Sequence, residues 1–231
     1  MNSLKIGIPS KGRLQVATSA WFADRGLTLR KTGHDREYAG AFDGISGVTP
    51  VLLSAGEIPT ELAAGRIHLG VTGIDLVQEK LPLRDTQVTL MEELGFGSAD
   101  LVIAVPKFWV DVSTIDDLDA VAAEFRANHG FRLRIATKYH NTVREYLTQA
   151  GVADYQLVDS QGATEGTVKN LTAEAIADIT STGATLDANH LKMLADGPIL
   201  KSQACLYKSL TADWSDVLAW KPLADQLGWA A

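Results

Sequence analysis

The sequence predicts an α/β protein with two lobes and mainly parallel sheets. Short apolar runs rich in β-branched residues alternate with helix-like patterns along almost the whole chain of 231 residues. Such alternation is typical of parallel sheets covered by helices. The number of these units indicates two lobes rather than one sheet. Glycines interrupt the pattern at 94–100, so we expect the first boundary there.

Nine segments have the length and apolar character of strands. They are LKIGIP (4–9), TPVLLS (49–54), IHLGVTG (67–73), TQVTLME (86–92), LVIAVP (101–106), FRLRIAT (131–137), YQLVDS (155–160), AIADIT (175–180) and QACLYKS (203–209). Leu14, Ala17 and Trp21 recur at helical spacing, and Gly26 is a typical C-terminal stop for such a helix. Further helices are predicted at 113–130, 141–151, 184–197 and 213–229.

The order of these elements divides the chain into two lobes. Lobe I takes residues 1–95 together with 206–231, and lobe II takes residues 96–205. In this division a second crossing near residue 205 returns the last helix to the first lobe.

Composition argues against several classes of function. The formal net charge of −7 is unlike that of a nucleic-acid binder, and no apolar run approaches the length of a membrane span. The N-terminus has no signal-peptide pattern. Cys205 is the single cysteine, which rules out an internal disulfide and a cysteine-cluster metal site. These features indicate a cytoplasmic protein with neither a nucleic-acid nor a membrane partner.

Basic residues gather near the N-terminus. The first 36 positions contain seven Lys or Arg residues against two Asp residues, in a chain that is acidic as a whole. They can be solvated surface charges, as most Lys and Arg residues are. They can also form a local pocket for a small polyanion. The charge pattern alone leaves both interpretations open.

The stretch ADITSTGATLDAN at 177–189 places a loop of small residues between a predicted strand and helix. The first amides of a helix lack partners and carry its positive end, so they can hold an anion. Gly183 allows the backbone to wrap closely, and Asp178 can accept hydrogen bonds from sugar hydroxyls. Further hydroxyl donors are Ser181, Thr182 and Thr185. The loop suits a phosphate monoester, although an ordinary turn with a capping Ser or Thr fits as well. Neither a Walker A motif nor G-x-G-x-x-G is present.

The segment DITSTGATL (178–186) resembles the phosphoribosyl-pyrophosphate motif of the ATP phosphoribosyltransferases, which catalyse the first step of histidine biosynthesis. Other matches to this family follow in order over nearly the whole chain. They are IPSKGRL (8–14), DREY (35–38), HLGVTGIDLVQE (68–79), LGFGSADLVIAVP (94–106), LRIATKYHNTVREYL (133–147) and GATEGTVKNLTAEAIADITSTGATLDANHL (162–191). Together they are specific, although several are weak individually.

The resemblance implies a fold and a reaction. The fold would be like that of the type II periplasmic binding proteins, with the active site in the cleft between the lobes. The enzyme would transfer the phosphoribosyl group of phosphoribosyl pyrophosphate to N1 of ATP, and release pyrophosphate. Mg²⁺ would arrive with the pyrophosphate group and need few protein ligands, so we expect no metal site built by the protein.

The resemblance also implies roles for individual residues. Arg13 and Arg36 are expected to be catalytic, because preorganised arginines would stabilise the negative charge that builds on the departing pyrophosphate. The expected substrate-binding residues are Lys11, Gly12, Glu165, Asp178, Ser181, Thr182, Gly183, Ala184 and Thr185. Adenine N1 is unprotonated at neutral pH, so no strong general base is needed. We therefore interpret the five scattered histidines as structural or surface residues.

The length of the chain resembles the short form of the family, which lacks a C-terminal regulatory domain. Short-form chains work with a histidyl-tRNA-synthetase-like subunit, so this subunit is the implied partner of a homodimer within a hetero-oligomer. The segment SAGEIPTEL (54–62) departs from the family pattern. Ser54 stands where many members have Arg, and Glu61 stands where they have Tyr, which puts any nucleotide contact there in doubt.

Two other functions remain compatible with parts of the pattern. A phosphoribosyltransferase for another base would need the same phosphate loop. A two-lobed solute-binding protein would share the implied architecture. Such binding proteins are typically exported, however, and they need neither a phosphate loop nor a basic pocket.

Overall fold

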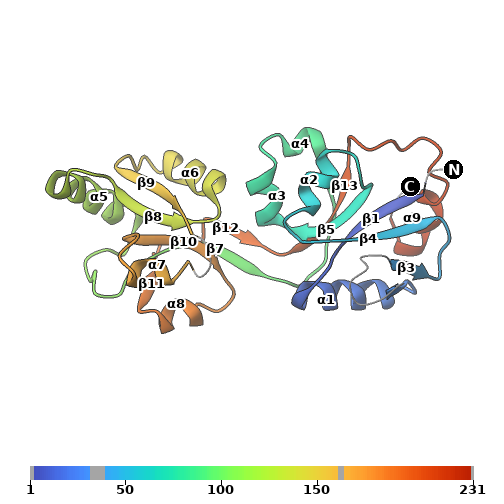
Figure 1. The fold of residues 1–231 in the computed structure, drawn as a ribbon, viewed down its shortest axis with the longest axis horizontal. Coiled ribbons are helices and arrows are strands. Elements are labelled where there is room, and N and C mark those ends of the chain that lie inside the picture. Colours follow the sequence, from blue (N-terminus) through green and yellow to red (C-terminus); the bar gives the residue numbers. More distant parts are fainter. Residues whose placement is uncertain (1–2, 32–39, 161–163, 230–231) are drawn as a thin grey trace. The chain divides into compact units, whose positions relative to one another are not determined.

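The structure is a computed structural model that describes residues 3–31, 40–160 and 164–229. Its contacts divide the chain into two compact units (Figure 1). Unit 1 comprises Met1–Gly97 and Gln203–Ala231, and unit 2 comprises Ser98–Ser202. The chain therefore crosses between the units twice, at 97/98 and at 202/203. The sequence pattern predicted these crossings at 95/96 and 205/206.

Unit 1 is built on a mixed sheet with the strand order β4-β1-β5-β13-β6. These strands are β4 (Val48–Leu53), β1 (Leu4–Pro9), β5 (Leu69–Gly73), β13 (Ala204–Ser209) and β6 (Val88–Glu93). β1 pairs in parallel with both β4 and β5, whereas β13 is antiparallel to β5 and to β6. A separate antiparallel pair is formed by β2 (Thr28–Lys31) and β3 (Gly40–Asp43).

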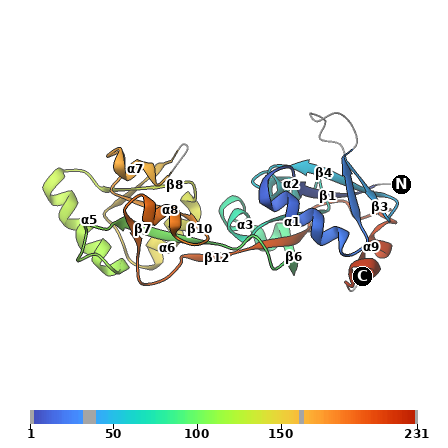
Figure 2. The ribbon, with the colours of Figure 1, turned by 90° about the horizontal axis from the view of Figure 1, so that it is seen from below.

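Helices cover both faces of this sheet. One face packs against α1 (Gly12–Ala23) and α9 (Trp220–Leu227), and Figure 2 shows α1 lying across it. The other face packs against α2 (Ile58–Ala63) and α3 (Ile74–Lys80), which are followed by α4 (Arg84–Gln87). Cys205 lies fully buried on this second face. Burial raises the pKa of its thiol to about 12.

Gly70 allows α2 to approach the sheet closely. A Cβ at this position would lie 2.6 Å from Ile58 Cγ2 and 3.2 Å from Leu62 Cδ1, both on α2. Ile58 and Leu62 are themselves fully buried. The absence of a side chain at Gly70 therefore determines how near the helix lies to β5.

Unit 2 also has a mixed sheet, with the strand order β11-β7-β10-β8-β9. The strands are β11 (Leu191–Met193), β7 (Ala99–Pro106), β10 (Ala175–Thr180), β8 (Leu133–Thr137) and β9 (Tyr155–Asp159), and β12 (Leu200–Ser202) also pairs with β7. β10, β8 and β9 are parallel neighbours, and β7 is antiparallel to β10.

Alternating residues of β7 contribute to two apolar layers. Leu101, Ile103 and Val105 face the layer that includes α5 (Ile115–His129) and α6 (His140–Gln149). Val102 and Ala104 face the layer that includes α7 (Gly166–Lys169) and α8 (Ala184–Ala188). In Figure 1, α6 lies on one side of the sheet of unit 2 and α7 and α8 on the other. The sheet is thus covered on both faces.

The predicted helix at 113–130 is confirmed, with clear signals at both ends. Thr114 and Asp117 form a reciprocal capping box at its start. Gly130 ends it with a left-handed backbone at φ of 77°.

Three sequence-based expectations need correction. The sheets are mixed rather than mainly parallel, because β7 and β13 run antiparallel to their neighbours, and strand–helix alternation does not show the direction of these strands. The helix predicted at 184–197 ends at Ala188, since His190 turns left-handed (φ 58°) and the chain continues as β11. The helix predicted at 213–229 begins only at Trp220, after the left-handed residue Asp216.

Other elements were not foreseen from the sequence. They are α2, α3, α4, α7, β2, β3, β11 and β12, most of which are too short to show a period. In the described part of the chain, no helix is long and apolar enough to cross a membrane.

We predict that Gly70→Ala destabilises unit 1 by about 1–3 kcal/mol, because the added methyl group overpacks the contact with α2. Urea denaturation of the full chain measures the change. Gly56→Ala is the matched control, since a Cβ at Gly56 meets no atom within 4 Å. Equal stability of the two variants would contradict the close packing described here.

Candidate active site

The predicted phosphate loop follows β10 in unit 2. β10 ends at Thr180, and α8 begins at Ala184. Between them, Gly183 has a φ of 73°, a conformation that favours glycine. The N–H of Gly183 donates to Thr180 Oγ1 at 2.8 Å, which closes the turn from inside the loop. The structure thus places residues 181–183 in a tight turn and residues 184 and 185 in the first turn of α8.

The predicted hydroxyl donors of this loop differ in their contacts. Ser181 Oγ donates to the carbonyl of Ser98 at 3.1 Å and so links the loop to the residue before β7. Thr182 Oγ1 accepts from the N–H of Ala184 at 3.3 Å, which leaves its own O–H available as a donor. Thr185 lies exposed in the first turn of α8. Of these three hydroxyls, that of Ser181 is engaged elsewhere in this structure.

Asp178 lies near the carboxyl end of β10. One of its carboxylate oxygens, Oδ1, accepts from the N–H of Ile179 at 2.8 Å. The preceding residue, Ala177, is in register with Thr137 at the end of β8. Asp178 therefore stands at an edge of the sheet that other strand ends share.

Sequence reasoning missed the ends of β8 and β9 at this same edge. Thr137 is in register with Asp159 of β9, and its Oγ1 accepts from the N–H of Tyr139 at 2.9 Å. His140 Nε2 lies 2.6 Å from Asp159 Oδ1. The available signal was the polar run after each predicted strand, because parallel strands gather their carboxyl ends at one edge, where α/β proteins bind ligands.

Glu165 occupies the N-cap position of α7, but its side chain makes no capping hydrogen bond. The residue before it, Thr164, is fully buried and forms a hydroxyl–hydroxyl hydrogen bond of 2.8 Å with Ser160, next to the end of β9. This buried bond positions the start of α7. The carboxylate of Glu165 is therefore not used to cap the helix.

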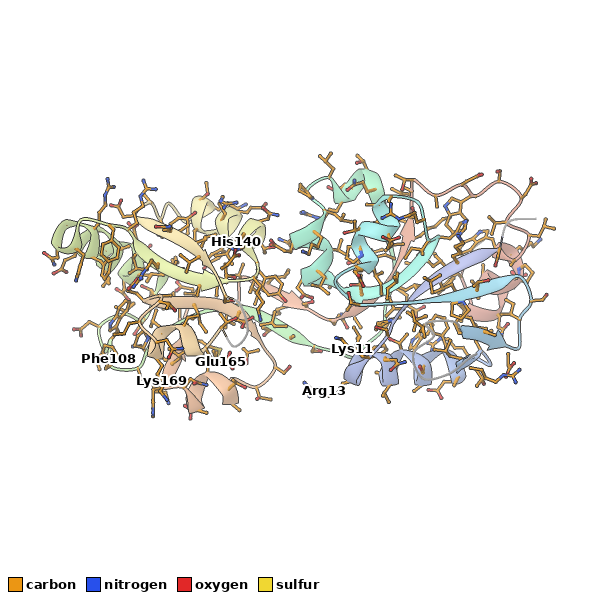
Figure 3. The ribbon with its side chains drawn as sticks, viewed as in Figure 1. Lys11, Arg13, Phe108, His140, Glu165 and Lys169 are labelled. Atoms are coloured by element: carbon orange, nitrogen blue, oxygen red, sulfur yellow. The ribbon has the colours of Figure 1, made fainter. Side chains whose placement is uncertain are left out.

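Lys11 and Arg13 lie at the amino-terminal end of α1, directly after β1 (Figure 3). Both are exposed, and Gly12 between them has a φ of 75°. The N–H of Ser10 donates to the carbonyl of Leu53 at 2.7 Å, which fixes this turn to the end of β4. The first turn of α1 has no acidic residue. Cations at the positive end of a helix oppose its dipole, so this charge pattern favours anion binding rather than helix stability.

The surroundings of Lys11 include one carboxylate. Hydrogen bonds from Ser54, one of them from its N–H at 2.9 Å, lower the pKa of Glu57 below its usual range. The positive charge of Lys11 acts in the same direction. The second predicted catalytic arginine, Arg36, lies outside the described residues.

Comparisons with known proteins bear on the family to which this chain belongs. A family model described as "HisG: ATP phosphoribosyltransferase" matches residues 54–227. An ATP phosphoribosyltransferase of Cereibacter sphaeroides is 70% identical over 214 residues, which cover 93% of this chain and 91% of the relative. The chain belongs to the ATP phosphoribosyltransferase family.

Members of the family that differ in length match this chain. An ATP phosphoribosyltransferase of Rhodopseudomonas palustris (strain BisB18) is 53% identical over 91% of the chain, but the match spans only 65% of that relative. A Thermotoga maritima structure, described as an ATP phosphoribosyl transferase (HisG:HisZ) complex, covers 97% of this chain and 96% of its own, with 21% identity and a TM-score of 0.73.

The periplasmic-binding-protein-like fold is confirmed by structural similarity as well. A histidine kinase sensor domain, described as similar to periplasmic binding proteins, matches 98% of the chain and 89% of its own. The TM-score is 0.53 at 13% identity, so this likeness concerns the fold alone.

Of the two departures from the family pattern, Glu61 lies in α2 and Ser54 directly follows β4. Glu61 accepts two hydrogen bonds of 2.6 Å from Arg66, which lower the pKa of its carboxyl group. Ser54 is the partner of Glu57 described above. In this ATP phosphoribosyltransferase, both positions are thus occupied by local contacts. Among the residues that the structure describes, no cluster of three His, Cys, Asp or Glu side chains could hold a metal ion.

An ion pair between Asp187 and Lys107 joins α8 to the segment after β7, and this pair lowers the pKa of Asp187. Lys107→Met is predicted to raise that pKa towards the ordinary value of about 3.9. Because the folded pKa lies below the unfolded one, the pair stabilises the fold above the unfolded pKa. This contribution is lost as the pH falls through the folded value. Carboxyl-carbon NMR titration measures the shift.

Lys201→Met serves as the control for this titration, since Lys201 is an exposed lysine in the same unit and forms no ion pair among the described residues. This control substitution should leave the pKa of Asp187 unchanged. An Asp187 pKa that is the same in Lys107→Met as in the wild type would contradict the role of the pair.

Proposed function

We propose that this chain transfers the phosphoribosyl group of phosphoribosyl pyrophosphate to N1 of ATP, the first step of histidine biosynthesis. The products are phosphoribosyl-ATP and pyrophosphate. The observation that carries the proposal is the 70% identity to the C. sphaeroides ATP phosphoribosyltransferase over 93% of the chain. Both substrates are cytoplasmic metabolites, so we place the activity in the cytoplasm.

The reaction exchanges one bond for another at the ribose. The lone pair of adenine N1 forms a bond to C1 of the ribose, and the bond from C1 to pyrophosphate oxygen breaks with inversion. N1 is unprotonated at neutral pH, so no strong base is required. The ribose becomes cation-like while negative charge builds on the leaving group. Preorganised positive charge near that group is therefore the largest contribution the protein can make.

Unit 2 supplies groups suited to the phosphoribosyl end of the substrate. We assign the 5-phosphate to the loop 181–185, where Gly183 permits the tight turn and Thr182 retains a free O–H. Asp178 is assigned to the ribose hydroxyls, since only one of its oxygens has a local partner among the described contacts. Glu165 is assigned to the same sugar, because its carboxylate caps no helix.

Unit 1 supplies the cations for the pyrophosphate end. Arg13 and Lys11 are exposed at the start of α1, and the helix gains nothing from charges of that sign there. An arginine fork matches two phosphate oxygens at once. Mg²⁺ belongs to the substrate in this proposal, since it binds pyrophosphate oxygens and keeps most of its waters. Arg36 is assigned the same role as Arg13 on the family resemblance alone.

We further propose a histidyl-tRNA-synthetase-like regulatory subunit as partner of a homodimer of this chain. The support is the match to the Thermotoga chain, which was solved as a HisG:HisZ complex and of which 96% is covered.

The proposed reaction is tested with purified chain, ATP, phosphoribosyl pyrophosphate and Mg²⁺, with and without the partner subunit. We expect phosphoribosyl-ATP, followed by its ultraviolet absorbance, and a rate that the partner changes. Binding of phosphoribosyl pyrophosphate without product in either arm would show that the acceptor is another base. No binding at all would refute the transferase.

Arg13→Ala is predicted to lower kcat by about 100-fold or more, as expected for loss of a group that stabilises transition-state charge. The same change should leave the free energy of unfolding unchanged or slightly higher, because it removes a cation from the positive end of α1. Turnover and urea denaturation are measured on the same preparation. Arg144→Ala, an exposed arginine on α6, is the control. A near-normal kcat in Arg13→Ala would remove this residue from the mechanism.

A further inference from the structure

Unit 2 contains a pocket of about 580 Å³ that the proposed reaction does not use. It lies on the α7 and α8 side of the sheet. Its wall includes Phe108 and Trp109 after β7, Val168 and Lys169 at the end of α7, and Leu191 at the start of β11. The size is within the usual range for small-molecule sites, about 300–1,000 Å³.

Two residues in the wall of this pocket have a costly backbone. Leu171 and His190 each have a φ of 58°, and Asp216 is the only other non-glycine residue with positive φ in the described chain. Leu171 ends α7 in a Schellman-type turn, in which its N–H donates to Val168 and that of Thr172 to Thr167. Glycine is the ordinary residue at such a position.

His190 ends α8 in a similar way, with its N–H donating to the carbonyl of Asp187 at 3.0 Å. Both short helices thus end on a strained residue that carries a side chain, and both residues line the same pocket. Glycine would give either turn at a lower conformational cost. The side chains at these two positions therefore serve something other than the fold of the turns.

Apolar side chains are exposed at the rim of the pocket. Leu171 is 80% exposed and Phe108 is 76% exposed. The ring of Phe108 and the indole of Trp109 offer flat apolar surfaces, which suit an aromatic ring system.

The charge of the pocket is positive. The one carboxylate among its described lining residues, Glu174, is neutralised by Arg134, which donates to Oε2 at 3.1 Å and to Oε1 at 2.5 Å. Lys169 forms no ion pair among the described residues and lies exposed at the rim. An anionic group on an aromatic ligand would find its counter-charge in Lys169.

The pocket holds the far ends of the two helices that begin at the proposed substrate site. α7 begins after Glu165 and ends at Lys169, and Figure 3 shows these two residues at opposite ends of it, with Phe108 on the Lys169 side. α8 begins after Gly183 and reaches the pocket at Ala188. Each helix has about one turn, so a shift at one end is transmitted to the other.

We propose that this pocket is a second ligand site, for a planar aromatic anion, and that its occupation changes the affinity of the 181–185 loop for the substrate phosphate. The second part rests on the function proposed above. Any such coupling is reciprocal, so the substrate changes the affinity of the pocket by the same factor.

Two matched probes test the pocket in the full chain. They are 8-anilinonaphthalene-1-sulfonate and N-phenyl-1-naphthylamine, which differ only by the sulfonate. We expect one molecule of the sulfonate to bind per chain and to quench Trp109, the only tryptophan of unit 2. Lys169→Gln should weaken the binding of the sulfonate probe by about threefold to fivefold, as expected for an exposed charge. It should leave the binding of the neutral probe unchanged. Lys201→Gln should affect neither probe.

Glycine variants separate the pocket from the stability of the fold. Leu171→Gly should weaken the binding of both probes by about tenfold, because apolar contact is lost. His190→Gly should weaken the binding of both probes as well. Neither variant should lower the melting temperature, because glycine accepts the left-handed backbone. Asp216→Gly is the matched control, with the same backbone outside the pocket. Two outcomes would overturn the proposal. One is that Leu171→Gly binds the probes as tightly as the wild type does. The other is that ATP displaces the probe while none of these variants changes the affinity for it.

The coupling is tested by titrating phosphoribosyl pyrophosphate with and without the sulfonate probe. A change in its Kd, matched by an equal change for the probe, is the expected result. Independent binding of the two would overturn the regulatory part. A chain that does not bind phosphoribosyl pyrophosphate would instead refute the proposed function, and the binding of the probe would still stand by itself.

Discussion

The constraint on which the rest depends is the parallel pairing of three neighbouring strands in each unit. Parallel strands end at the same edge, and a side chain placed just after one strand has those of the next as neighbours. In unit 1 this edge holds the basic turn after β1 and the turn after β4. In unit 2 it holds the loop after β10 and the polar ends of β8 and β9. Apart from Glu165, which lies at the start of α7, the described candidate site residues lie at or just after such strand ends.

Backbone conformation is the second constraint, and it acts in opposite ways at different positions. At Gly12 and Gly183 a left-handed turn is made by glycine, so the turn costs little and leaves room for a ligand next to the main chain. At Leu171 and His190 the same conformation is adopted by residues with a side chain, for which it is energetically unfavourable. This contrast distinguishes turns shaped for close approach from turns whose side chains are needed.

Much of this architecture could be predicted from the sequence, and the failures have physical causes. The longer strands of both sheets were found because β-branched apolar runs are a local property, whereas the three-residue strands β11 and β12 were missed. Strand direction was not found, because it depends on where the chain crosses between units, and β7 and β13 both follow such crossings. The phosphate loop was recognisable because strand, small residues and helix are consecutive. The contact of His140 with Asp159 could not be recognised from the sequence, since these residues come together only through the pairing of β8 with β9.

The buried position of Cys205 has a practical consequence. Burial raises the pKa of this thiol to about 12 and so keeps it protonated at ordinary pH, whereas the thiolate is the species that oxidants and alkylating reagents attack. The single cysteine is therefore unreactive towards thiol reagents in the folded chain. A cysteine introduced at an exposed position of either unit would be the one reactive thiol. The unmodified sequence is thus a ready background for site-specific labelling.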